Sequence, residues 1–131
     1  MMTITILMLS LFLSNAKAPD TKVVYIAVPE EINYYDALMR AIVMVESKGD
    51  IFAFNFLEQA AGPMQIRPCR INHYNKLVGS NYTTADCFDL ELSRKVFLRF
   101  AQGKNYSQAA KDWNGSGPMT LDYWKLVKAK L

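Results

Sequence analysis

The sequence predicts a single compact, mainly α-helical domain with a small irregular β element. Its 131 residues are enough for one domain with one modest core. Hydrophobic residues make up 51% of the chain and charged residues 21%, a balance typical of a globular rather than a disordered protein. Apolar side chains recur at helical spacing in several segments, and turn-forming residues separate these segments.

Residues 1–18 have the features of a secretory signal peptide. The apolar run at 4–13 is too short to span a bilayer comfortably, and a small-x-small cleavage site ends at Ala18. The first three residues carry no Lys or Arg, so an uncleaved membrane anchor is the alternative. We therefore expect a secreted or periplasmic protein, in which residues 19–33 form an extended lead-in to a domain at 34–131.

The first predicted helix runs from Tyr34 to Glu46. Asn33 is placed to cap its start, and Gly49 stops it. Glu46 then lies in the last turn, at the border between the core and a cleft. The residues expected to face the core share helical spacing and are Leu38, Ala41, Ile42 and Val45.

The middle of the chain predicts a short β excursion followed by a helix. Residues 51–60 alternate imperfectly between apolar and polar side chains, as an irregular β segment does. A short helix is expected over 70–78, and Gly79 ends it. Pro68 is either a break or an early position of this helix, because proline is tolerated in a first turn.

Three more helices are predicted toward the C-terminus. The longest begins at Asp86 or Asp89. Ser107 is expected to cap a short helix that runs through Trp113, and Thr120 to cap the last helix. The residues expected along the buried face of that last helix are Leu121, Trp124, Val127 and Leu131.

Glu46 is the candidate catalytic group. A carboxylate at the edge of an apolar helix is a candidate general acid, because burial raises its pKa and keeps a proton available near neutral pH. A glycine-containing segment, residues 62–66, follows downstream and carries the polar Gln65 in its middle. A glutamate at a helix end is more often a solvated surface residue. The prediction that Glu46 is catalytic therefore depends on its occurrence together with Ser47 and residues 62–66.

No metal, cofactor or nucleic-acid partner is expected. His73 is the single histidine, and no paired-ligand motif accompanies it. The net charge is +3, and the basic residues are scattered rather than gathered in a stripe. Nucleophilic catalysis by serine or cysteine is disfavoured because His73 has no recognisable partner.

Cys69 and Cys87 leave two alternatives open. In an exported protein they could form a disulfide, which would close a loop of about 18 residues and contribute roughly 3 kcal/mol. Two buried free thiols are the other alternative. Their spacing matches no metal site.

Four motifs occur in an order that resembles a known family. They are Glu46-Ser47, Ala61-Gly62-Pro63-Met64-Gln65-Ile66, Trp113-Asn114-Gly115 and Tyr123-Trp124. In this order they resemble the lytic transglycosylases of the soluble type, which are similar to g-type lysozymes and share their fold. The resemblance covers about residues 34–127. It implies an α+β lysozyme-like fold and cleavage of the MurNAc-GlcNAc β-1,4 bond of peptidoglycan.

The resemblance also implies roles for individual residues. Glu46 matches the catalytic acid and base of the family. Gln65 could hydrogen-bond the sugar or a reacting water, and Tyr123 matches a tyrosine that approaches the acid. Core packing is the alternative for Met64. The residues that match the family's substrate-binding positions are Ser47, Met64, Gln65, Asn114 and Tyr123.

The implied mechanism uses one carboxylate and yields an anhydro-muramic product. The alternatives are a lysozyme-type hydrolase of the same bond and a catalytically silent wall-binding or scaffold protein. A hydrolase with two carboxylates would need a second one, for which Asp50, Glu58 and Asp112 are candidates with an expected surface role. The chain departs from the family at Gln59, where a glycine is frequent, and at Pro63, where leucine is commoner.

The partner that the resemblance implies is the glycan strand of peptidoglycan, with the protein acting as a monomer. A membrane is a partner only if the N-terminal segment is retained.

Overall fold

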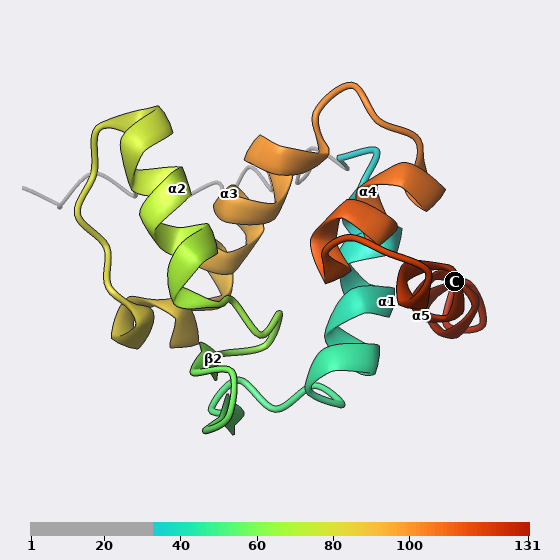
Figure 1. Ribbon diagram of the computed structural model, residues 1–131, viewed down its shortest axis with the longest axis horizontal. Coiled ribbons are helices and arrows are strands. Elements are labelled where there is room, and N and C mark those ends of the chain that lie inside the picture. Colours follow the sequence, from blue (N-terminus) through green and yellow to red (C-terminus); the bar gives the residue numbers. More distant parts are fainter. Residues whose placement is uncertain (1–32) are drawn as a thin grey trace, which may run out of the picture. The chain divides into compact units, whose positions relative to one another are not determined.

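The computed structural model describes residues 33–131, and this part of the chain is mainly helical (Figure 1). The prediction of an α-rich domain with a small β element is confirmed. The predicted signal segment and nearly all of the lead-in lie outside the described residues. The described elements are α1 (Asp36–Glu46), β1 (Phe54–Asn55), β2 (Ala60–Ala61), α2 (Pro68–Val78), the 3₁₀ helix η1 (Thr84–Phe88), α3 (Leu90–Ala101), α4 (Tyr106–Asn114) and α5 (Met119–Lys128).

The two strands form a minimal antiparallel sheet, in which Phe54 pairs with Ala61 and Asn55 with Ala60. This sheet is the β excursion predicted for residues 51–60, shifted by one residue at its end. Among the described helices, none combines the length and the apolar character that a membrane crossing requires.

Helix α1 begins two residues later than predicted. The Asn33 side chain accepts a hydrogen bond from the Tyr35 N–H (2.9 Å), and the Asp36 carboxylate accepts one from the Asn33 N–H (2.7 Å). These two bonds close a turn ahead of the helix instead of capping it directly. Glu46 is the last residue of α1, as expected. The buried residues of α1 are Leu38, Met39, Ala41 and Ile42, while Val45 is half-buried.

The helices in the middle of the chain begin where local chemistry favours it. Pro68 occupies the first turn of α2, where its missing N–H is not needed. Gly79 ends α2 in the left-handed conformation, with φ of 69°. Asp89 caps α3 by accepting a hydrogen bond from the Leu92 N–H at 2.8 Å.

The predicted caps of the last two helices were wrong. Asn105, not Ser107, caps α4: its side chain accepts from the Gln108 N–H (2.9 Å), and the Gln108 side chain accepts from the Asn105 N–H (3.4 Å). This reciprocal pair satisfies two backbone donors at once. Thr120 lies inside the first turn of α5, where its hydroxyl donates to the Gly117 carbonyl at 2.7 Å.

The buried face of α5 also differs from the prediction. Leu121 and Leu131 are more than half exposed, and Trp124 is half-buried. Helix α5 packs against both α4 and α1, so its contact stripe follows the geometry of these two partners. Apolar side chains occur on more than one side of α5, so their spacing did not identify that stripe. The buried residues of α5 are Thr120, Tyr123 and Val127.

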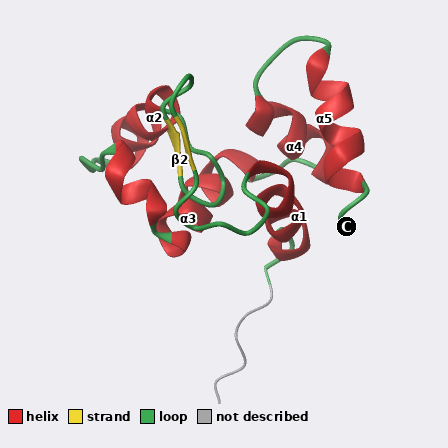
Figure 2. Cartoon of the chain, turned by 90° about the horizontal axis from the view of Figure 1, so that it is seen from below, coloured by secondary structure: helices red, strands yellow, loops and turns green. Residues whose placement is uncertain are grey.

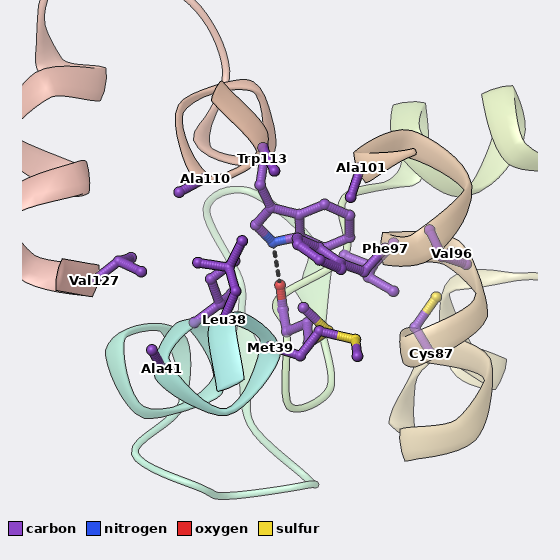
Figure 3. Packing of buried hydrophobic residues seen from close by; sticks show 14 of the residues in the cluster. Leu38, Met39, Ala41, Cys87, Val96, Phe97, Ala101, Ala110, Trp113 and Val127 are labelled. Atoms are coloured by element: carbon purple, nitrogen blue, oxygen red, sulfur yellow. Dashed lines mark hydrogen bonds between the residues drawn. The ribbon is translucent and has the colours of Figure 1, made fainter. Parts of the chain in front are cut away.

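The described helices, together with strand β2, form two neighbouring groups. Helices α1, α4 and α5 contact one another, whereas α2, α3, η1 and β2 make up the other group (Figures 1 and 2). Contacts between α3 and α4 join them. The Trp113 indole lies in the core between Leu38 of α1 and Phe97 of α3 (Figure 3).

Gly62 fixes the segment that follows β2. Its φ is +80°, and a Cβ built there would lie 1.8 Å from the carbonyl oxygen of Cys87 in η1. Only glycine allows both this conformation and this approach. The backbone at Gly62 is therefore pressed directly against η1.

We expect Gly62→Ala to lower the free energy of unfolding by about 3 kcal/mol or more, because strain and a backbone clash add. Gly103→Ala is the matched control: its φ is +77°, but nothing lies within 4 Å of the added carbon. Strain alone should cost about 1 kcal/mol there. Urea unfolding of both variants measures the difference, and equal costs would contradict the close packing at Gly62.

Candidate active site

Glu46 and Tyr123 meet where α1 ends beside α5. The Tyr123 hydroxyl donates a hydrogen bond of 2.7 Å to Oε1 of Glu46. Tyr123 is buried and Glu46 is half-buried. The two residues are 77 positions apart in the chain. Their contact therefore depends on the packing of α5 against α1, and it places Tyr123 at Glu46 as the motif order predicted.

Burial controls the ionisation of both groups. Removal from water raises the pKa of Glu46 above its usual 4.5, and this effect outweighs the opposing hydrogen bond from Tyr123. The charge of Arg67 also acts to lower the pKa of Glu46, and that of Glu58 to raise it. Burial and the neighbouring carboxylate raise the pKa of Tyr123, so its hydroxyl stays protonated and donates.

Glu46 lines a small cleft of about 50 Å³. Most of the groups around it are polar or charged, and they come from α1, the β region, α2 and the end of α4. The lining residues are Glu46, Glu58, Gln65, Arg67, Cys69, Arg70, Trp113 and Asn114.

Gln65 belongs to a tight turn that forms one wall of the cleft. Ala61 and Ile66 exchange two backbone hydrogen bonds, of 3.0 and 2.9 Å, across this turn. Gln65 has a φ of +50°, and its Nε2 donates to the carbonyls of Gly62 (2.9 Å) and Ala53 (3.1 Å). The side chain is thus fixed at the cleft wall, in the place predicted for it.

Two residues at predicted substrate-binding positions, Met64 and Ser47, do not line the cleft, and for Met64 the alternative of core packing holds. Met64 is 1% exposed, and its side chain is part of the core; only its backbone carbonyl has a defined polar contact, with the Trp113 indole N–H at 3.2 Å. The Ser47 hydroxyl donates to the Val43 carbonyl at 3.1 Å and so closes the end of α1. Neither side chain lines the cleft of Glu46.

Asn114 lines the cleft as predicted, and two arginines that the prediction missed lie beside it. Arg70 Nη2 donates to the carbonyls of Asp112 and Trp113, each at 3.0 Å, and Arg67 Nη1 donates to that of Asn114 at 3.4 Å. Two cations thus face the carbonyl end of α4, where the helix dipole favours positive charge. The only sequence signal was their three-residue spacing at the start of α2.

Of the three candidates for a second carboxylate, Glu58 alone lines the cleft of Glu46. It forms an ion pair with Arg67 at 3.0 Å, and both side chains are more than 40% exposed. Asp112 instead pairs with Lys104 at 2.7 Å, and Asp50 accepts a hydrogen bond from the Phe52 N–H at 2.8 Å. Glu58 is thus an exposed surface residue, as expected, and it also lines the cleft.

Of the two alternatives for Cys69 and Cys87, the structure has the free thiols rather than the disulfide, but only Cys87 is buried and Cys69 is exposed. Cys87 is buried in the core, and its thiol donates to the carbonyl of Thr83, the residue that caps η1, at 3.6 Å. Burial raises the pKa of this thiol to about 12, which makes it unreactive. Cys69 is exposed and lines the cleft, so the two thiols face different surroundings.

Comparisons of the chain with protein-family models, with curated proteins and with solved structures each return no match. A function must therefore be argued from the motifs and from the geometry of this cleft.

The raised pKa of Glu46 has a consequence for stability. Below pH 4.5 the carboxyl is protonated in both the folded and the unfolded state, so it does not affect folding. As the pH rises, the unfolded state ionises first, and the folded protein loses stability until the pH passes the folded pKa. We expect Glu46→Gln, which stays neutral, to gain stability relative to the wild type between pH 4 and pH 8. Urea unfolding at both pH values tests this, and a difference that is independent of pH or reversed would contradict it.

Proposed function

We propose that this protein is a lytic transglycosylase that cleaves the MurNAc-GlcNAc β-1,4 bond of peptidoglycan, with Glu46 as its single acid and base. The observation that carries the proposal is the half-buried Glu46 held by the Tyr123 hydroxyl at 2.7 Å in the wall of a polar cleft. The ordered motifs support it, because Glu46, Gln65 and Asn114 line this cleft and Tyr123 hydrogen-bonds to Glu46.

The chemistry requires a group that first gives and then takes a proton. Protonated Glu46 donates to the glycosidic oxygen as the bond to the anomeric carbon breaks, and the N-acetyl group of the muramic residue stabilises the resulting cation. The Glu46 carboxylate then removes the proton of the muramic 6-hydroxyl, whose oxygen closes the anhydro ring. A pKa raised by burial suits the first step, and the Tyr123 hydrogen bond stabilises the carboxylate between the steps.

An aromatic loop beside the cleft supports an extended, partly apolar ligand such as a glycan. We define this loop as residues 52–57. Phe52, Phe56 and Leu57 are 73%, 85% and 97% exposed, and the Phe54 and Phe56 rings pack edge-on at 4.9 Å. Glu58, the next residue, lines the cleft. Exposed apolar patches of this kind mark binding surfaces, and sugar rings present apolar faces to aromatic side chains.

A lysozyme-type hydrolase is the second candidate, and Glu58 is the observation that favours it. Inverting hydrolases use one carboxylate as the acid and another to activate water. Glu58 shares the cleft with Glu46, but its ion pair with Arg67 favours a role in holding the wall. In either case we propose a secreted or periplasmic protein, because its substrate lies outside the cytoplasm.

Digestion of purified sacculi tests the proposal. We expect soluble muropeptides with anhydro-muramic ends in the mass spectrum. Reducing ends would instead indicate the hydrolase, and an absence of soluble fragments from the folded wild type would contradict both enzymatic candidates.

Glu46→Gln and Glu58→Gln are a matched pair of variants for this digestion. We expect at least a 100-fold loss of turnover for Glu46→Gln, the size of a missing general acid, with wall binding retained. Glu58→Gln should lose less than tenfold if Glu46 acts alone. Retained turnover in Glu46→Gln would show that the acid is misassigned.

A further inference from the structure

A second hollow of about 470 Å³ adjoins the cleft of Glu46. Cys69 and Arg70 line both spaces, so the two are neighbours across these residues of α2. The hollow is roughly ninefold larger than the cleft and falls within the range of pockets that hold small ligands. The mechanism proposed for Glu46 does not use it.

The hollow gathers nitrogen-bearing side chains. Arg70, His73 and Lys104 line it, and its single acidic group, Asp112, pairs with Lys104 at 2.7 Å. His73 packs against Phe100, with 5.2 Å between the ring centroids. Arg70 and Lys104 exceed Asp112 by one positive charge, so the lining is suited to an anion.

Arg70 is held in place with donors to spare. Its guanidinium carbon lies 4.5 Å from the centre of the Trp113 ring and 5.1 Å from that of Phe100. Its Nη2 donates to two carbonyls, whereas its Nε and Nη1 make no hydrogen bond to the residues that the structure describes. A guanidinium fixed by two rings can present these remaining donors to a carboxylate without losing much freedom.

We propose that this hollow binds the carboxylate-bearing peptide carried by the muramic residue of the glycan. The inference rests on the proposed function, because it takes the glycan to lie at Glu46. The peptide is attached to the muramic sugar beside the bond that is cut, so it must leave the cleft nearby. The adjoining cationic hollow is complementary to it in charge and large enough for part of it.

Binding in the Glu46→Gln background, which keeps the substrate intact, tests the proposal without turnover. Short soluble wall glycans that carry their peptides are compared by calorimetry with the same glycans after an amidase has removed the peptides. We expect the peptide-bearing form to bind more tightly. Adding His73→Gln and Lys104→Gln together should weaken binding of the peptide-bearing glycan about tenfold, which corresponds to the loss of one charge-assisted hydrogen bond. The same two substitutions should change binding of the stripped glycan less than twofold.

Lys125→Gln is the matched control, because Lys125 also pairs with an aspartate, Asp122 at 2.8 Å, but on α5 outside both spaces. It should leave both affinities unchanged. Thermal unfolding of each variant, singly and combined, verifies that the fold is retained. Equal binding of the two glycan forms, or an equal loss in the Lys125 variant, would overturn the inference, as would no binding of either form. Failure of the proposed function is detected by a separate experiment, the digestion of sacculi, in which the wild type would then release no soluble fragments.

Discussion

The indole of Trp113 is the contact on which the arrangement of the cleft depends. Its N–H donates to the Met64 carbonyl at 3.2 Å, its ring meets Phe97 edge-on at 5.2 Å, and Arg70 lies over it at 4.5 Å. A buried indole N–H without an acceptor costs about 1–3 kcal/mol. The turn at Met64 cannot move away from α4 without that cost. Through its contacts with Met64, Arg70 and Phe97, the Trp113 side chain therefore connects α4 to the turn, to α2 and to α3.

A different contact controls the chemistry on the other side of the cleft. The Tyr123 hydroxyl reaches Glu46 because α5 packs against α1, and the hydrogen bond between them is partly shielded from water. Burial and this hydrogen bond shift the pKa of Glu46 in opposite directions, and burial is the larger effect. A group that must release and recover one proton benefits from such opposing influences, because neither of its forms is then strongly disfavoured.

Most features that depend on local chemistry could be predicted from the sequence, although the caps of α4 and α5 were misassigned. Features that depend on packing could not, apart from the contact of Tyr123 with Glu46, which the order of the motifs indicated. Helix α1 with Glu46 at its end, the small β element and the cap at Asp89 follow from spacing and capping. The buried face of α5 depends on its partners α1 and α4. The different exposure of Cys69 on α2 and Cys87 on η1 depends on the fold around each of them. The order of the motifs correctly predicted that Gln65, Asn114 and Tyr123 lie near Glu46. It also predicted Met64 in the cleft, but the Met64 side chain lies in the core. Arg67 and Arg70 acquire their role only once the end of α4 lies beside them.

The protonation of Glu46 is the claim on which the proposed chemistry stands. Titration of its side-chain carboxyl by carbon-13 NMR, assigned by comparison with Glu46→Gln, measures it directly. We expect a midpoint above 4.5 in the wild type, and a higher one in Tyr123→Phe, because the lost hydrogen bond acts to lower the pKa of Glu46. A midpoint at or below 4.5 in the wild type would contradict the assignment of Glu46 as a general acid raised by burial.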